Sequence, residues 1–342
     1  MSKLKVAVIG CGSIAKHRHI AEYANNPYVA LVAFCDPSKE RAQAMADQFG
    51  GKAYTDYQEL LENETIDAVS VCTPNVYHAP ISIAALKAGV HVLCEKPMAV
   101  SLEESDQMIL AAEQNGVVLM IGHNQRLMPP HVKAKEILSR GYLGKVLSFR
   151  TAFGHAGPEQ WSAEGPGGWF FQKEKAFVGA IGDLGVHKID LIQWLLEDEI
   201  VEVGAFLGTL AKQNTDVDDN AVCIFRTRCG VVGTMAASWT HQPGEDNSTI
   251  LYCEKGIVKI GTDPRDQIIV ELKDHGTERY QVGGIATNEE GGQSSSGVID
   301  AFIEAIRTGE PPLVPGTEGR KSLRVVLAAL QSVEEKRVVT IE

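Results

Sequence analysis

The sequence lacks the features of membrane and secreted proteins. No apolar run in its 342 residues approaches the roughly 20 residues that a membrane-spanning helix needs. The chain starts directly with a strand-like segment, without a charged leader, a long apolar stretch or a small-residue cleavage site. We therefore expect no membrane association and a cytoplasmic location.

Positive charge is also scarce. Lys and Arg number 32 against 44 Asp and Glu, which gives a formal net charge of −12 at pH 7. This charge repels a phosphate backbone, and no dense Lys/Arg cluster offsets it. We expect no nucleic-acid partner.

The seven cysteines form neither a disulfide framework nor a zinc motif. Their number is odd, no Cys-x-x-Cys pair occurs, and Cys35, Cys72 and Cys94 each end an apolar segment. Buried, reduced thiols fit this pattern. His17 and His19 have no acidic or cysteine partners at ligand spacing, so no metal site is expected.

Length and patterning predict two domains, since 342 residues exceed one ordinary hydrophobic core. In residues 1–122, apolar segments alternate with amphipathic ones, which predicts an α/β domain with a Rossmann doubly wound parallel sheet. Residues 123–342 are rich in β segments and predict an α+β domain with a large, mainly antiparallel sheet. A glycine- and serine-rich segment at 283–297 predicts a mobile loop, and the C-terminal helices have room to pack back onto the first domain.

The spacing of apolar residues and the residues that cap helices predict individual helices and strands. A capping box formed by Ser101 and Glu104 marks the start of a helix that Gly116 ends. Helices are also expected at 183–196, 298–308 and 317–335. The expected strands are 6–9, 31–35, 68–72, 91–94 and 117–121 in the first domain, and 146–153, 201–207, 221–226, 231–238 and 268–272 in the second.

A glycine-rich turn follows the first strand. Gly10 permits a tight turn, Gly12 lets the backbone approach a pyrophosphate, and the next helix begins with amides facing the phosphates. Asp36 closes the second strand, where an acid accepts hydrogen bonds from the adenosine ribose. This pair predicts a nicotinamide dinucleotide, although a glycine turn alone also occurs in other α/β proteins.

The cofactor preference depends on the same acid. Asp36 repels a 2′-phosphate and favours NAD, whereas Ser38, Lys39 and Arg41 leave NADP as an alternative. The strand at 68–72 ends at the edge of the sheet where such folds bind ligands. Thr73, Pro74 and Asn75 follow it, and they either contact the cofactor or form a simple turn of small polar residues. The residues expected at the cofactor are Gly10, Gly12, Ser13, Ile14, Asp36, Thr73, Pro74, Asn75, His78, Glu95 and Lys96.

Hydride transfer from an alcohol needs a base and a group that stabilises negative charge on oxygen. Lys96 ends the strand at 91–94, in the half with the glycine turn, and can reach the reactive end of the cofactor. Asp183 and His187 are spaced i, i+4, which places both on one face of a helix. Taken singly, Lys96 could pair with Glu95, and a lone histidine in a helix is usually a packing or surface residue.

In this order, the motifs resemble the Gfo/Idh/MocA oxidoreductase family, named for glucose–fructose oxidoreductase and inositol dehydrogenase, over nearly the whole chain. The resemblance implies that Lys96 is the catalytic lysine, His187 the acid/base histidine and Asp183 an acid that helps to hold the substrate. It also implies a homodimer or homotetramer formed through the open sheet face. The residues that carry it are Gly10, Gly12, Ala15, Glu95, Lys96, Pro97, Asp183, Gly185, His187 and Asp190.

The substrate is expected to be a sugar, a sugar derivative or a cyclitol. Aromatic side chains with polar neighbours precede the 183–196 helix and suit a sugar ring, although they equally suit packing. Asn124 and Arg126 either line the cleft or join the domains. The residues expected at the substrate are Lys96, Asn124, His155, Trp161, Trp169, Asp183 and His187.

These expectations indicate an NAD(P)-dependent dehydrogenase that acts on a secondary hydroxyl, or the reverse reductase. Two alternatives remain: a redox-neutral, NAD-dependent enzyme that cleaves or eliminates glycosides, and a non-catalytic regulator that senses the cofactor. Which of Lys96 and His187 takes the first proton stays open.

Overall fold

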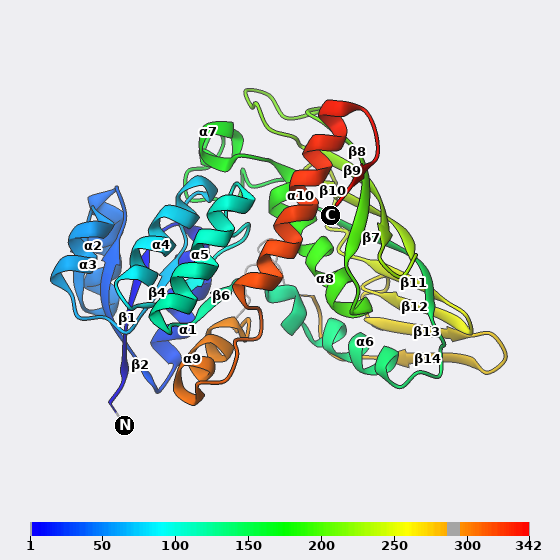
Figure 1. Ribbon diagram of the computed structural model, residues 1–342, viewed down its shortest axis with the longest axis horizontal. Coiled ribbons are helices and arrows are strands. Elements are labelled where there is room, and N and C mark those ends of the chain that lie inside the picture. Colours follow the sequence, from blue (N-terminus) through cyan, green and yellow to red (C-terminus); the bar gives the residue numbers. More distant parts are fainter. Residues whose placement is uncertain (1, 286–294, 342) are drawn as a thin grey trace.

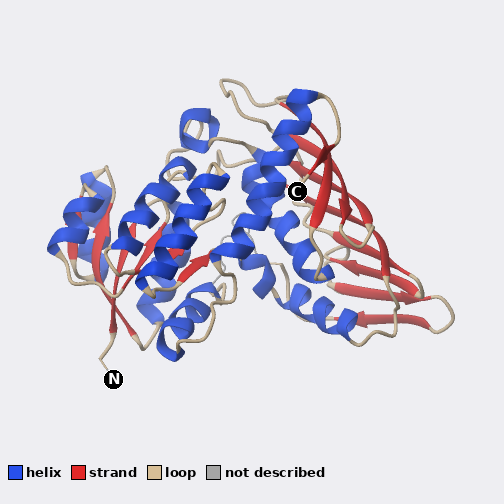
Figure 2. Cartoon of the chain, viewed as in Figure 1, coloured by secondary structure: helices blue, strands red, loops and turns tan. Residues whose placement is uncertain are grey.

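Two β-sheets lie at opposite ends of the molecule and a long helix runs between them (Figure 1). The computed structural model describes residues 2–285 and 295–341. Most of the segment expected as a mobile loop, 283–297, falls outside these residues. Helices lie around the first sheet and along only one side of the second (Figure 2). Within the described residues, no helix has the length and apolar composition needed to cross a membrane.

The first sheet is parallel, with strand order β3-β2-β1-β4-β5-β6 in the described chain. This is the doubly wound order, in which ligands bind at the carboxyl ends of the strands where the order reverses, here between β1 and β4. The predicted Rossmann sheet is confirmed. Its strands are β1 (Leu4–Ile9), β2 (Val29–Cys35), β3 (Lys52–Tyr54), β4 (Ala68–Val71), β5 (His91–Cys94) and β6 (Leu119–Ile121).

Both faces of this sheet are covered because its central strands are apolar throughout. Val6 and Val8 pack on the face that carries α1, α2 and α9, whereas Ala7 and Ile9 pack on the face that carries α3, α4 and α5. Continuous burial of this kind is typical of parallel strands. These helices are α1 (Ile20–Asn25), α2 (Lys39–Phe49), α3 (Tyr57–Asn63), α4 (His78–Lys87), α5 (Leu102–Asn115) and α9 (Val298–Thr308).

The predicted boundaries of α5 are confirmed. Ser101 accepts a hydrogen bond from the Glu104 amide, and the Glu104 carboxylate accepts one from the Val100 amide. The helix ends at Gly116, whose φ of 62° lies in the left-handed region that glycine adopts readily. Cys35, Cys72 and Cys94, at the carboxyl ends of β2, β4 and β5, are buried free thiols as predicted.

The second sheet has the order β14-β13-β12-β11-β7-β10-β9-β8-β15 in the described chain. Every pair is antiparallel except β7 with β10, so the mainly antiparallel prediction is confirmed. Strands β3, β11, β12, β14 and β15 are additional to those expected. The strands of this sheet are β7 (Val146–Gly154), β8 (Ile200–Gly208), β9 (Asn220–Thr227), β10 (Val232–Ser238), β11 (Thr249–Cys253), β12 (Gly256–Ile260), β13 (Ile268–Leu272), β14 (Gly276–Tyr280) and β15 (Val339–Thr340).

Helices α6, α8 and α10 cover one face of this sheet (Figure 1). Helix α10 also packs on the first sheet, since Leu323 belongs to that core while Val325 and Val326 belong to the core of the second. The C-terminal helices therefore pack back onto the N-terminal half. The helices not yet given are α6 (Pro129–Ser139), α7 (Lys173–Ala176), α8 (Val186–Leu196) and α10 (Gly316–Glu335).

A buried ion-pair cluster joins three elements between the sheets. Arg126, in a short helix after β6, donates to both carboxylate oxygens of Asp190 on α8, at 2.8 and 2.7 Å. It also donates to Glu318 on α10, at 2.9 Å. Arg126 and Asp190 are both buried. Arg126 therefore ties the segment after β6 to α8 and α10, all within residues 123–342, and it does not line the cavity described below.

We predict that Arg126→Met will lower the free energy of unfolding by about 3–5 kcal/mol, because it leaves the Asp190 carboxylate buried without its partner. Arg320→Met is the matched control: Arg320 also donates twice to one carboxylate, that of Asp106, but this pair is exposed. Its loss should cost less than about 1 kcal/mol. Urea unfolding of both variants measures the difference, and equal costs would contradict the prediction.

Candidate active site

The glycine turn has the shape that a dinucleotide phosphate requires. At Gly10, φ is +90°, and a Cβ there would lie 2.5 Å from the Cys72 carbonyl oxygen, so a larger residue does not fit. At Gly12, a Cβ would meet no atom within 4 Å. The backbone before the first helix thus faces open space, in which a pyrophosphate can approach the amides.

Asp36 is held at the edge of this turn. Its carboxylate accepts hydrogen bonds from the Cys11 amide at 2.9 Å, the Ser38 amide at 2.8 Å and Arg41 Nε at 3.0 Å. The ion pair keeps the Arg41 guanidinium beside a carboxylate instead of leaving it free for a 2′-phosphate. The local geometry therefore favours a ribose with free hydroxyls.

A loop from the second half of the chain lies against the turn. The Ser13 hydroxyl donates to the Trp161 carbonyl oxygen at 2.7 Å, and Arg41 lies 3.6 Å from a carboxylate oxygen of Glu164. The loop that carries the predicted substrate aromatics therefore also contacts the predicted cofactor turn.

A cavity opens at the carboxyl ends of β4 and β5 and extends to the second half of the chain. It contains many of the predicted residues, whereas Gly10, Gly12, Ser13, Asp36 and Pro74 lie outside its lining. It is lined by Ile14, Arg18, Cys72, Thr73, Asn75, His78, Glu95, Lys96, Pro97, Asn124, Gln125, Phe153, His155, Trp161, Trp169, Phe170, Val178, Asp183, Leu184 and His187.

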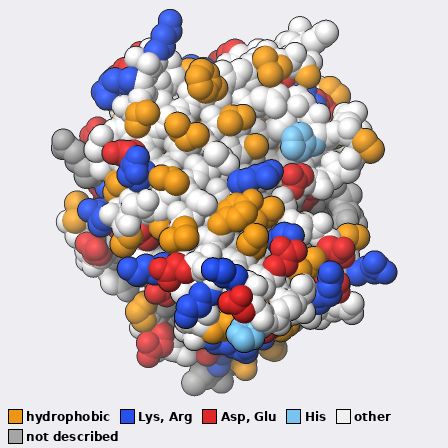
Figure 3. All heavy atoms as spheres, turned by 90° about the vertical axis from the view of Figure 1, so that its right-hand side faces the viewer, with side chains coloured by type: hydrophobic (Ala, Val, Ile, Leu, Met, Phe, Trp, Pro, Cys, Tyr) orange, Lys and Arg blue, Asp and Glu red, His pale blue; other side chains and the backbone are white. Residues whose placement is uncertain are grey.

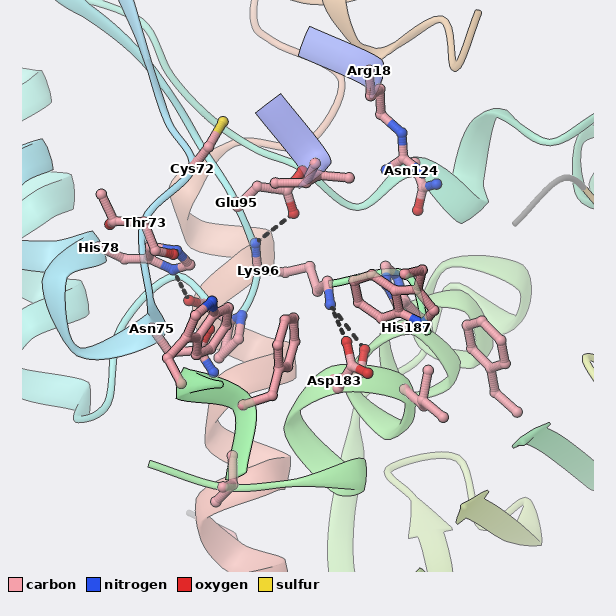
Figure 4. Close-up of a pocket in the computed structure, with 18 of the residues that line it drawn as sticks. Arg18, Cys72, Thr73, Asn75, His78, Glu95, Lys96, Asn124, Asp183 and His187 are labelled. Carbon is pink, nitrogen blue, oxygen red and sulfur yellow. Dashed lines mark hydrogen bonds and ion pairs between the residues drawn. The ribbon is translucent and has the colours of Figure 1, made fainter. Parts of the chain in front are cut away.

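Lys96 and Asp183 meet in this cavity (Figure 4). Lys96 follows β5, and its Nζ donates to Asp183 Oδ1 at 3.0 Å and to the Asp183 carbonyl oxygen at 2.9 Å. Trp239, directly after β10, donates from its indole nitrogen to the other carboxylate oxygen at 3.0 Å. The ammonium group of a lysine from the first half of the chain is thereby fixed by residues of the second half.

His187 lies in the first turn of α8 and lines the same cavity. Its ring centre is 6.2 Å from that of His123 and 5.9 Å from that of Phe153, and its Nδ1 has no hydrogen-bond partner among the described residues. Burial, followed by the positive charge of Lys96, lowers the pKa of His187 well below its usual value. The ring is therefore neutral at pH 7 and can accept a proton.

A carboxylate outside the cavity shapes the segment that carries Asp183 and His187. Asp218 accepts hydrogen bonds from the amides of Gly179 and Ile181, both at 2.8 Å. A Cβ at Gly179 would lie 1.9 Å from the Asp218 carbonyl oxygen, so glycine is required there. The segment then forms a single π-helical stretch, η5 (Ile181–Gly185), that runs into α8. The helix expected at 183–196 is confirmed, and its first turn is the π-helical stretch η5 instead of α-helix.

Glu95 is held as a buried carboxylate behind Lys96. His19 Nε2 lies 2.9 Å from one of its oxygens, and the Lys96 amide donates to the other at 3.2 Å. Burial raises the pKa of Glu95, but the hydrogen bond from His19 and nearby positive charges outweigh it and lower the pKa to about 2. Glu95 forms its hydrogen bond with the backbone amide of Lys96, whereas the Lys96 ammonium group is bound to Asp183.

Three other residues predicted at the cofactor, Thr73, Asn75 and His78, lie after β4, and two of them form hydrogen bonds to neighbouring segments. The two ring nitrogens of His78 lie 2.7 and 2.8 Å from the carbonyl oxygens of Pro97 and Thr73, and burial lowers its pKa. Asn75 donates to the Ala176 carbonyl oxygen in the second half of the chain. The Thr73 hydroxyl is buried without a partner among the described residues. This unpaired group at the cavity is suited to a polar group of a bound dinucleotide.

Aromatic rings form the opposite wall. Trp169 stacks on Phe170 with ring centres 3.8 Å apart, and Trp161 meets Phe170 edge-on at 5.2 Å. His155 lies 6.3 Å from Trp161. Both tryptophans therefore pack on Phe170 and also line the cavity, so both expected roles are compatible with the structure.

The cavity also contains residues that sequence reasoning missed. Arg18, Gln125, Phe153 and Phe170 line it, and Asn124 lies in it as expected. Arg18 belongs to a π-helical turn, η1 (Ala15–His19), which no hydrophobic period reveals. In the described part of the chain, no three His, Cys, Asp or Glu side chains gather in a way that could hold a metal ion.

Comparison with known proteins agrees with this geometry. Residues 4–123 match the oxidoreductase family with the NAD-binding Rossmann fold, and residues 131–259 match the GFO/IDH/MocA C-terminal domain. Myo-inositol 2-dehydrogenase of Thermotoga maritima is 30% identical over 345 residues, covering 99% of both chains. Levoglucosan dehydrogenase of Pseudarthrobacter phenanthrenivorans is 30% identical over 312 residues, covering 82% of this chain and 79% of the relative.

A solved structure extends the likeness to the whole fold. Levoglucosan dehydrogenase in complex with NADH and L-sorbose superposes with a TM-score of 0.88 at 27% identity, and the match covers 100% of each chain. The ordered motifs, both sheets and the full-length relative agree, and the chain therefore belongs to the Gfo/Idh/MocA oxidoreductase family, with that family's NAD-binding Rossmann fold at its N-terminal end.

Proposed function

We propose that the protein is an NAD-dependent dehydrogenase that transfers hydride between nicotinamide and a secondary hydroxyl or ketone of a sugar, sugar derivative or cyclitol. The observation that carries this proposal is the convergence of Lys96, Asp183 and His187 in one cavity at the ligand-binding edge of the Rossmann sheet. Support for the substrate class comes from relatives named myo-inositol 2-dehydrogenase and levoglucosan dehydrogenase.

In the proposed mechanism, bound NAD supplies the hydride acceptor. His187, kept neutral by burial and by Lys96, accepts the hydroxyl proton. Lys96 provides positive charge where the alcohol oxygen becomes negative. Asp183 orients the Lys96 ammonium, and Trp239 holds Asp183. An imidazolium beside Lys96 is electrostatically unfavourable, so His187 releases the proton to solvent water instead of retaining it.

The cofactor residues take distinct roles in this proposal. The backbone around Gly10, Gly12, Ser13 and Ile14 binds the pyrophosphate, since it faces open space at a helix start. Asp36 binds the adenosine ribose. Further along the crevice, Thr73, Asn75, His78 and Glu95, in the segments that follow β4 and β5, shape the nicotinamide end, and Pro74 holds the turn between Thr73 and Asn75.

We further propose that residues 1–122 act as the cofactor domain and 123–342 as the substrate and oligomerisation domain, in a cytoplasmic homodimer or homotetramer. The open face of the second sheet supports self-association (Figure 3). Phe206 on β8 is 85% exposed and pairs with exposed Val222 on β9, and Ile224 on β9 is 55% exposed. A contiguous apolar patch on a β-sheet is typical of an interface between subunits.

We predict that Lys96→Ala will leave NADH binding nearly intact and lower turnover by about 100-fold or more, because charge stabilisation at the reacting oxygen is lost. The assay follows NADH formation with a panel of sugars, sugar acids and cyclitols. Lys87→Ala, at an exposed lysine of α4, is the control. Unchanged turnover in Lys96→Ala would remove this lysine from the mechanism. Product formed without any net NADH would indicate a redox-neutral reaction.

We predict that Asp36→Ala will reduce the preference for NAD over NADP by about 10-fold or more. The variant removes the carboxylate that repels a 2′-phosphate and releases Arg41, which can then bind that phosphate. The measurement is the ratio of kcat/KM for the two cofactors, with Glu62→Ala as an exposed acidic control. An unaltered ratio would show that Asp36 does not set cofactor choice.

We predict that Ile224→Glu will convert the oligomer into a smaller species, because a charge at the centre of an apolar interface stays unpaired when the subunits associate. Leu110→Glu, at an exposed leucine of α5 in the first half of the chain, should leave the mass unchanged. Light scattering after size-exclusion chromatography gives the masses. A wild-type protein that is monomeric at all concentrations would refute the proposed assembly.

A further inference from the structure

Arg18 is a buried cation that faces the active-site cavity (Figure 4). It is 8% exposed, and its Nε has no hydrogen-bond partner among the described residues. No ion pair joins its guanidinium to a carboxylate in residues 2–285 or 295–341. Its neighbours Lys16 and His17 are exposed, so the π-helical turn directs this one cation inward.

Arg18 helps to lower the pKa of the buried Glu95 carboxylate, but no carboxylate lies within ion-pair distance of the guanidinium in the described residues. A buried guanidinium without such a direct partner is unfavourable, which indicates that a ligand completes the site. The other charged groups at the cavity are already engaged. Lys96 is paired with Asp183, and the carboxylate of Glu95 is occupied by His19 and by the Lys96 amide. Arg18 thus keeps its hydrogen-bonding capacity for a group that enters from outside.

The surroundings of Arg18 favour an anion in particular. Of the two cations that line the cavity, Lys96 is paired with Asp183, whereas Arg18 has no carboxylate within ion-pair distance in the described residues, so Arg18 is the cation left to meet an anion. Asn124 lies beside Arg18 in Figure 4, and its amide oxygen also has no partner among the described residues. A polar amide next to a guanidinium suits a substrate that carries an anionic group together with hydroxyls.

The position of Arg18 assigns this anion to the substrate and not to the cofactor. The cofactor phosphates have their own site at the turn formed by Gly10 and Gly12, where the backbone faces open space. Arg18 lies further along the first helix and lines the cavity that Lys96 and His187 share. A group bound to Arg18 is therefore part of the molecule that reacts there.

Building on the dehydrogenase function above, we propose that Arg18 binds a carboxylate or phosphate of the substrate, so that the enzyme prefers anionic sugars or cyclitols to neutral ones. The guanidinium offers two parallel donors, which match the two oxygens of either group. Arg18 acts in substrate selection, whereas Lys96 and His187 act on the hydroxyl.

The test uses the full-length protein saturated with NADH and measures binding by calorimetry, independently of turnover. The probes are D-glucuronate for a carboxylate, D-glucose 6-phosphate for a phosphate and D-glucose as the neutral reference. We expect either D-glucuronate or D-glucose 6-phosphate to bind at least about 10-fold more tightly than D-glucose. The tighter of these two probes identifies the anionic group as a carboxylate or a phosphate.

Variants then connect this preference to Arg18. Arg18→Met should weaken binding of the preferred anion by about 100-fold and leave glucose binding nearly unchanged, while Arg18→Lys should give an intermediate loss. Lys16→Met removes the same charge from the exposed side of the same helical turn and should have less than about a 2-fold effect. Thermal unfolding and NADH affinity verify that each variant is folded.

The outcomes separate this proposal from the proposed function. Glucose binding as tightly as both anions, or equal losses for all three probes in Arg18→Met, would overturn it. A loss of NADH affinity in that variant would assign Arg18 to the cofactor and also overturn it. Arg18-dependent anion binding without NADH production from any sugar, sugar acid or cyclitol would contradict the dehydrogenase and leave the anion site established.

Discussion

The ion pair between Lys96 and Asp183 is the contact on which the site depends. Lys96 belongs to the strand end of a parallel sheet, and Asp183 belongs to a helix that packs on a different sheet. Neither side chain is held in place by its own half of the chain alone. The placement of the two halves of the chain relative to each other therefore determines whether an ammonium group and an imidazole share one cavity.

Two sets of buried polar contacts keep that geometry rigid. Behind the nucleotide-binding half, Glu95 links His19 to the backbone of Lys96. Behind the other half, Asp218 caps the π-helical stretch that presents Asp183. Buried networks of this kind constrain position because each group loses its hydrogen bond when it moves. A site whose side chains are fixed in position suits hydride transfer, which requires close alignment of donor and acceptor.

Charge distribution gives the cavity its chemical character. Arg18 and Lys96 are the cations that line it, and Asp183 and Glu95 are the carboxylates. Burial, followed by the charge of Lys96, keeps His187 neutral. This combination favours developing negative charge on a substrate oxygen and disfavours a stored proton on the ring. Trp161 and Phe170 add apolar surface to the wall of the cavity, and apolar surroundings strengthen interactions between charges.

The sequence by itself determined the strands and helices with strong apolar periods, and its ordered motifs predicted the roles that are proposed for Lys96 and His187. The strand at 91–94 has the predicted bounds because its burial is continuous. Strands such as β14 were not foreseen because they are partly polar and are stabilised by pairing with a neighbour. Only the tertiary structure decided the inward direction of Arg18, the cap from Asp218 and the meeting of the two halves, because each depends on contacts between residues distant in sequence or on a π-helical turn that side-chain spacing does not encode.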